Sequence, residues 1–204
     1  ICSQSLCLPY TYLMVIYIIV MQLQFDHIHT PCARVWQIHN VLGSEDSADA
    51  LLTHCEQLPY TLRQQLDNPT FTYEWEQCTD VNHPVCDLIE SDQFVNACVE
   101  ITHCAVTRVL SVWASRYSQG HYLTAHGDGV SQRKLAFLLY LNRGWQPEWG
   151  GALCVQQPNH DAWCMMPPQH GTLILMDVTQ NSLQHMVTQV THAHDRYALA
   201  GWLA

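Results

Sequence analysis

Charged side chains are scarce in this 204-residue chain, and basic ones are the scarcest. Charged residues make up 13% of it, with 8 Lys and Arg against 18 Asp and Glu, so the formal net charge is -10. Because binding to a phosphate backbone depends on clustered basic residues, no nucleic acid is expected as a direct partner. Apolar residues account for 48%, which is typical of a globular protein rather than a disordered one. The length suits one domain with a substantial core.

Paired cysteines are also missing. The chain has 10 Cys, but they are scattered, with no C-x-x-C pair and no zinc-site spacing. A disulfide framework is typical of short secreted chains, which this chain does not resemble. We therefore expect reduced, mostly buried thiols in a cytoplasmic protein.

No long hydrophobic run is present either. Residues 12–21 are apolar, but this run is shorter than the ~20 residues that a membrane helix needs. No Lys or Arg precedes it, unlike in a signal peptide, so no membrane association is expected. We interpret residues 1–30 as a strand, which their β-branched and aromatic content favours, or as an N-terminal extension with translation starting at Met14 or Met21. Residues 31–204 are expected to form a single domain.

The pattern of apolar residues predicts two helices and a series of short strands. Ser44 and Ser91 are good N-caps, and apolar residues recur at helical spacing after each of them. From residue 105 the period changes to two, with Gly and Pro between the strands. Strands are predicted within residues 33–42, 60–75, 105–114, 134–141, 152–155, 173–176, 186–190 and 197–203. This order predicts a mainly β fold, a sandwich or barrel flanked by N-terminal helices.

The triplet His126-Gly127-Asp128 is the first candidate for chemistry. A histidine and a carboxylate two residues apart on a strand point to the same side, and Gly127 adds no bulk between them. Such a pair can give one nitrogen and one oxygen to a cation, and His185 offers a third ligand inside an apolar run downstream. Two histidines and one carboxylate, with open positions opposite, form the facial triad of non-haem Fe(II) oxygenases.

Because the chain has 13 His, a triplet of the form H-x-D or H-x-E can occur in it by chance. His54-Cys55-Glu56 is a decoy, because it falls in a predicted helix, where residues two apart diverge by roughly 200°. Taken alone, His126 and Asp128 could equally be ordinary surface residues at the end of a strand.

The residues around the triplet resemble the prolyl-hydroxylase-like branch of the 2-oxoglutarate- and Fe(II)-dependent oxygenases. The resemblance is closest to the ribosomal-protein prolyl hydroxylases and their single-domain bacterial relatives. It covers nearly the whole C-terminal half, and before residue 100 only the order strand-helix-strand-helix is shared. In chain order, the matching features are Tyr117, Gly120, His126-Gly127-Asp128, Tyr140-Leu141-Asn142, Trp145, Gly150-Gly151, a distal His and Arg196.

Four histidines compete for the distal position. His170 lies in a turn before the strand that should precede the ligand, while His192 and His194 lie too close to Arg196 for a strand and a turn to intervene. His185 leaves the spacing to Arg196 that this branch shows. The branch often has Ser two residues before the distal His, a position that Leu183 occupies here.

The resemblance implies a double-stranded β-helix, the cupin-like jelly-roll. It implies that Fe(II) is held by His126, Asp128 and His185. It also implies that Arg196 binds the distal carboxylate of 2-oxoglutarate, since its guanidinium is a permanent, forked cation.

Three aromatic residues complete the implied pocket. Tyr140 and Tyr117 would donate hydroxyl hydrogen bonds to the cosubstrate, although Tyr140 could instead be a plain core aromatic. Trp202 would form a wall of the pocket, and a purely structural role is equally open for it.

The implied activity is the hydroxylation of a C–H bond with dioxygen, with release of succinate and CO2 and with ascorbate as a candidate reductant. The implied substrate is a prolyl residue of a protein. Two alternatives stay open: the same chemistry on a small molecule such as a free amino acid, and a non-catalytic jelly-roll that binds a metal. The presence of the whole triad together with Arg196 argues against the latter.

Overall fold

The computed structural model describes residues 22–130, 132–157, 162–179 and 183–204. The apolar run at residues 12–21 lies outside these ranges. The helices are α2 (Glu45–Glu56), α3 (Pro84–Ile89) and α4 (Asp92–Thr102), with a short 3-10 turn, η1 (Pro147–Trp149). The strands are β1 (Ile28–Cys32), β2 (Val35–Ile38), β3 (Thr61–Gln65), β4 (Tyr73–Cys78), β5 (Val109–Tyr117), β6 (Tyr122–His126), β7 (Leu135–Tyr140), β8 (Leu153–Gln156), β9 (Trp163–Met166), β10 (Thr172–Asp177), β11 (His185–Val187) and β12 (Arg196–Leu203).

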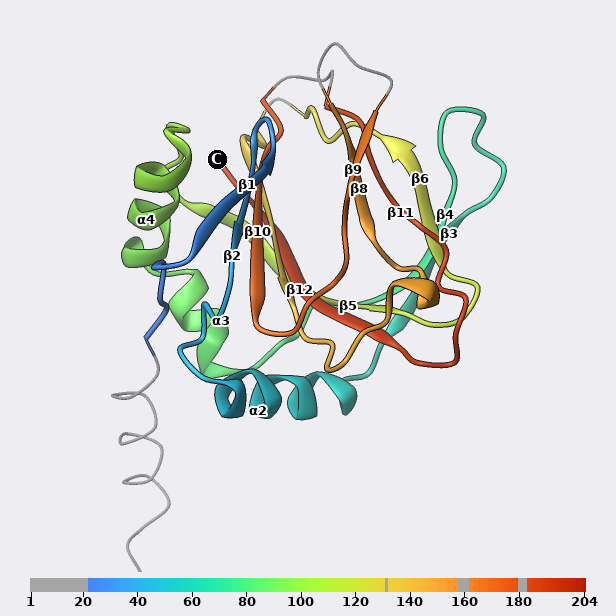
Figure 1. Cartoon of the computed structure of the whole chain (residues 1–204), viewed down its shortest axis with the longest axis horizontal. Coiled ribbons are helices and arrows are strands. Elements are labelled where there is room, and N and C mark those ends of the chain that lie inside the picture. Colours follow the sequence, from blue (N-terminus) through green and yellow to red (C-terminus); the bar gives the residue numbers. More distant parts are fainter. Residues whose placement is uncertain (1–21, 131, 158–161, 180–182) are drawn as a thin grey trace, which may run out of the picture.

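The strands form a jelly-roll in which all pairings are antiparallel. Their order is β1-β2-β10-β7-β12-β5-β4-β6-β11-β8-β9, with β3 paired to the outer side of β4. One end of β4 pairs with β5 and the other end pairs with β6, so this strand links two facing sheets. Figure 1 shows the helices on the side of the β2-β10-β12 sheet that faces away from β8, β9 and β11. The predicted mainly β fold with flanking helices is confirmed. No helix in the described ranges is long and apolar enough to cross a membrane.

Both predicted helix starts are confirmed. The Ser44 hydroxyl accepts a hydrogen bond from the Ser47 amide at 3.2 Å, and that of Ser91 accepts one from the Phe94 amide at 3.3 Å. The decoy His54-Cys55-Glu56 lies in α2, as expected. The prediction missed α3, which has a Pro at its start and spans only 6 residues. A segment this short offers fewer than two turns of periodicity to detect.

The sheet beneath the helices is buried on both faces. On β7, Leu135, Phe137 and Leu139 face the helices, and the Phe137 ring meets that of Phe94 edge-on at 5.7 Å. The intervening Ala136 and Tyr140 pack between the two sheets. This double burial explains why the sequence of β7 is continuously apolar instead of alternating.

A close backbone approach fixes the packing of β12. A Cβ at Gly201 would lie 2.0 Å from the Ser111 carbonyl oxygen and 2.4 Å from the Phe137 ring. No larger side chain fits there without movement of β5 or β7, because interiors are closely packed. Gly201 therefore lets β12, which carries Arg196 and Trp202, lie flat between its two neighbours.

Candidate metal centre

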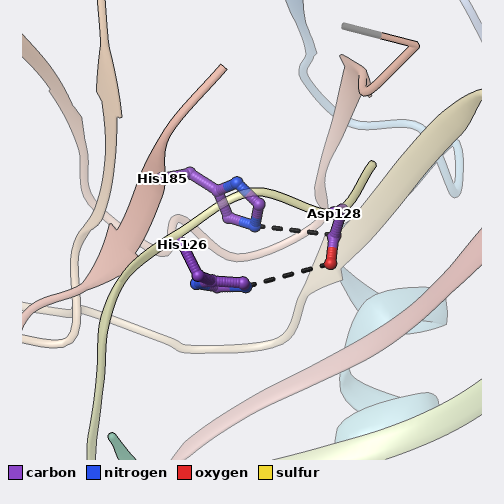
Figure 2. A group of neighbouring side chains, drawn as sticks. All are labelled: His126, Asp128 and His185. Carbon is purple, nitrogen blue, oxygen red and sulfur yellow. Dashed lines mark ion pairs between the residues drawn. The ribbon is translucent and has the colours of Figure 1, made fainter. Parts of the chain in front are cut away.

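Strand pairing brings the three predicted metal ligands together. His126 is the last residue of β6, and Asp128 follows just beyond the end of that strand. His185 is the first residue of β11 and lies directly opposite His126 in the β6–β11 ladder. The ligand atoms of the three residues all lie within 4.8 Å of one another. Figure 2 shows both imidazole rings turned toward the Asp128 carboxylate.

The imidazole rings are oriented for metal binding. His126 Nδ1 donates to the Thr124 carbonyl at 3.0 Å, which leaves Nε2 as the nitrogen nearest Asp128, 3.9 Å from Oδ1. His185 Nε2 lies 3.6 Å from Asp128 Oδ2. Burial, reinforced by the neighbouring His126, lowers the pKa of His185 to about 4, so its ring is neutral at pH 7. Neutral imidazole is the form that ligates metals. Two such nitrogens and a carboxylate fit an Fe(II) ion.

Two side chains that are not metal ligands contact the Asp128 carboxylate. Trp202 Nε1 donates to Oδ2 at 3.1 Å, and Arg133 Nη1 approaches Oδ1 at 3.5 Å. The Arg133 guanidinium lies 3.4 Å above the Trp202 ring, and Trp113 packs against Trp202 with ring centroids 4.5 Å apart. Trp202 is among the residues that line the cavity, and it also contacts a metal-site carboxylate, which the sequence did not suggest. Such outer contacts fix the orientation of metal ligands.

Arg196 is a buried cation with no acidic partner among the described residues. It begins β12 opposite Tyr117 on β5, and only 1% of it is exposed. Its Nη2 donates to the Tyr140 hydroxyl at 3.2 Å, and its guanidinium carbon lies 4.9 Å from the ring centroids of both Tyr117 and Tyr140. Within the described ranges Nε has no hydrogen-bond partner, and no carboxylate pairs with this side chain. An unpaired buried charge is costly, so the site calls for an anion.

The two tyrosines stay protonated beside this arginine. Burial raises the pKa of Tyr140 and of Tyr117 against the opposing effect of Arg196. Because Tyr140 accepts a hydrogen bond from Arg196, its own proton is left to donate to another group.

The Gly150-Gly151 turn leaves room for the arginine. Gly151 has φ +65°, and a Cβ there would lie 3.0 Å from Arg196 Cδ. Gly150 has φ +70°, and its Cβ would lie 1.9 Å from the Gln189 carbonyl oxygen. Glycine meets both requirements, a left-handed backbone and a close approach.

The metal site and Arg196 open into one cavity of about 480 Å³. The β3–β4 hairpin forms a wall that reaches the metal site, since Phe71 stacks on His126 with ring centroids 5.2 Å apart. Sequence reasoning assigned no site role to this hairpin, and it suggested no contact of Arg133 with Asp128. The residues that line the cavity include Arg63, Tyr73, Trp75, Trp113, Arg133 and Trp202.

The other candidates for the distal histidine lie elsewhere. His170 Nε2 is 3.0 Å from an oxygen of Asp49. His192 and His194 are exposed and stack on Trp149, at 4.8 and 4.4 Å between ring centroids. Of the described histidines that competed for this position, only His185 joins the His126–Asp128 pair.

The sequence and the fold are both similar to those of known oxygenases. Residues 112–204, which contain the triad and Arg196, match the model of the 2OG-Fe(II) oxygenase superfamily. Among solved structures, a prolyl-4-hydroxylase from Pseudomonas putida superposes with a TM-score of 0.64 at 21% identity, covering 83% of this chain and 91% of that one.

Two further structures share the fold. A Trichoplax adhaerens prolyl hydroxylase, in complex with a hypoxia inducible factor oxygen degradation domain peptide fragment, has a TM-score of 0.59 at 20% identity and covers 83% of each chain. HygX from Streptomyces hygroscopicus, with nickel and 2-oxoglutarate bound, has a TM-score of 0.60 at 14% identity, covering 95% of this chain and 86% of that one.

Proposed function

We propose that this chain, which belongs to the 2OG-Fe(II) oxygenase superfamily as a prolyl-hydroxylase-like dioxygenase, hydroxylates a prolyl residue of a protein and converts 2-oxoglutarate to succinate and CO2. The observation that carries the proposal is the pairing of two features in one cavity. One is the His126, Asp128 and His185 group, and the other is the buried Arg196, which pairs with no carboxylate of the described residues. The first fits Fe(II), and the second fits the distal carboxylate of an anionic cosubstrate.

In this proposal the protein binds and orients while the cofactors supply the chemistry. When bound, Fe(II) and 2-oxoglutarate together activate dioxygen for insertion into a C–H bond. Arg196 offers its guanidinium fork to the distal carboxylate, and Tyr140 donates its hydroxyl proton to the same oxygens. Tyr117 packs against the guanidinium and excludes water from it. Trp202 keeps Asp128 turned toward the metal.

The walls of the cavity favour a prolyl substrate. Tyr73 and Trp75 line it from the β3–β4 hairpin, and Trp113 and Trp202 line it from β5 and β12. Aromatic walls are the usual surface on which proline-containing segments dock. A prolyl ring between these walls would present its C–H bonds toward the metal site.

The experiment uses short peptides with one proline each, incubated with Fe(II), 2-oxoglutarate and ascorbate as the reductant. We expect succinate formation to rise with peptide, and mass spectrometry to find one added oxygen atom on the proline. Asp128→Asn is the matched control, since it keeps the size of the side chain but removes the charge. Turnover of free L-proline with no peptide product would instead favour the small-molecule alternative.

Two further proposals concern the cellular compartment and the extent of the domain. The eight described cysteines are all free thiols, which supports work in a reducing compartment, the cytoplasm. We also propose that residues 31–204 form a single domain, whose first strand, β1, begins close to this boundary at Ile28.

A further inference from the structure

Basic residues gather in the cavity of an otherwise acidic chain. The chain has 8 Lys and Arg and a net charge of -10, yet Arg63, Arg133 and Arg196 all line the same cavity. Asp128 is the one acidic side chain among the described lining residues. The proposed function uses Arg196 for the cosubstrate and Asp128 for the metal. Two arginines are left for the substrate.

Arg63 faces the cavity from β3. It pairs across the ladder with Trp75, so the two side chains share the cavity face of the β3–β4 hairpin. Its neighbour Leu62 points the other way and is 47% exposed. The Arg63 side chain is exposed to solvent, and it forms neither an ion pair nor a hydrogen bond with any part of the chain that the structure describes.

Arg133 stands on another wall, and its position is fixed. Its guanidinium lies 3.4 Å above the Trp202 ring and 3.5 Å from Asp128 Oδ1. A cation bound to Asp128 offsets the charge of that carboxylate, so Arg133 then lacks an effective counterion. Stacking on Trp202 keeps its planar fork oriented for an incoming carboxylate.

We propose that Arg63 and Arg133 bind the side-chain carboxylate of an acidic residue next to the target proline, so that the substrate is an acidic prolyl segment. This inference rests on the proposed function and specifies its substrate class. The position of Arg63 favours a peptide over a free amino acid. It is exposed on β3, whose far edge pairs with no described strand, so an extended chain can run along it.

The test compares three peptides that differ only in the residue beside the proline, which is Glu, Gln or Lys. For the unmodified protein loaded with Fe(II) and 2-oxoglutarate, we expect KM to be about fivefold lower for Glu than for Gln, the upper range for a solvent-exposed charge pair. The Lys peptide should have the highest KM. In Arg63→Glu the order should reverse, with Lys preferred over Glu.

Arg108→Glu is the matched control. It makes the same change in net charge at an exposed arginine outside the cavity lining. It should keep the order of the unmodified protein. Equal KM values for all three peptides, or an unchanged order in Arg63→Glu, would overturn the inference while peptide hydroxylation itself upheld the proposed function.

A second measurement covers the case in which no peptide is hydroxylated and the proposed function fails. Binding of the same peptides to the Mn(II)- and 2-oxoglutarate-loaded protein is followed by tryptophan fluorescence, since Trp75, Trp113 and Trp202 line the cavity. Tighter binding of the Glu peptide, lost in Arg63→Glu, supports the recognition of an acid. No binding, or binding independent of charge, overturns it.

Discussion

Replacing Arg196 by alanine should weaken the binding of 2-oxoglutarate and leave the binding of the metal nearly unchanged. The side chain is 1% exposed, and within the described ranges no carboxylate pairs with it. Its guanidinium is therefore available to a carboxylate from outside the chain. In Arg196→Ala that carboxylate would be buried near the Tyr140 hydroxyl but without the cation that meets it.

The size of the effect follows from the burial. Breaking a buried ion pair by removing one partner costs about 3–5 kcal/mol, which is about two to four decades in affinity. Arg196→Lys should recover part of this loss, because the charge survives but the fork does not. Tyr140→Phe removes one hydroxyl and should cost about 1 kcal/mol, the usual value for one neutral hydrogen bond.

The assay measures succinate formation against 2-oxoglutarate concentration, with Mn(II) binding measured in parallel. We expect a large rise in KM for 2-oxoglutarate in Arg196→Ala with nearly unchanged metal affinity. An unchanged KM would refute the reasoning. It would mean that another basic residue, such as Arg133 or Arg143, holds the carboxylate, or that this cosubstrate does not bind there.

Further changes test the rest of the account. Asp128→Ala and His185→Ala should each abolish Fe(II)-dependent succinate formation while circular dichroism shows a retained fold, and full turnover in either would remove that residue from the site. Trp202→Phe removes the indole hydrogen bond to Asp128 and should lower metal affinity or kcat by about 10–100-fold, the range for lost outer contacts; a change within twofold would make Trp202 only a wall. Gly201→Ala should lower the free energy of unfolding by about 1–3 kcal/mol in urea denaturation, because its Cβ meets β5 and β7, and unaltered stability would contradict the packing described. A chain that starts at Met21 should form succinate as the full chain does, since every site residue follows residue 60, and an insoluble product would point to a core role for the deleted residues.

Local signals predicted the parts of the fold that have strong patterns. Ser44 and Ser91 started helices as expected, and the continuous apolar run of β7 marked a strand buried on both faces. The strand β9 was not predicted, since it alternates weakly, with Trp163 and Met165 exposed, and β1, which contains Pro31, overlaps only the last residues of the range 1–30 that was interpreted as a strand or an extension. Both lie at the ends of the strand order, where pairing rather than sequence pattern holds them.

Some residues of the site could likewise be predicted from the sequence, and others could not. The spacing of His126 and Asp128 is local, and the resemblance to known oxygenases singled out His185 and Arg196. The contacts of Trp202 with Arg133 and with Asp128 join separate parts of the chain, and no periodicity reveals them. The approach of Phe71 to His126 likewise depends on how the β3–β4 hairpin folds over β6.

The most direct measurement follows both atoms of dioxygen during turnover of an acidic prolyl peptide. The protein is supplied with Fe(II), 2-oxoglutarate and dioxygen labelled with heavy oxygen, and the products are weighed by mass spectrometry. As a dioxygenase, the protein should place one labelled atom on the proline and one in succinate, in equal amounts, with no product from Asp128→Ala. Hydroxyproline without label, or peptide oxidation without succinate, would contradict the account.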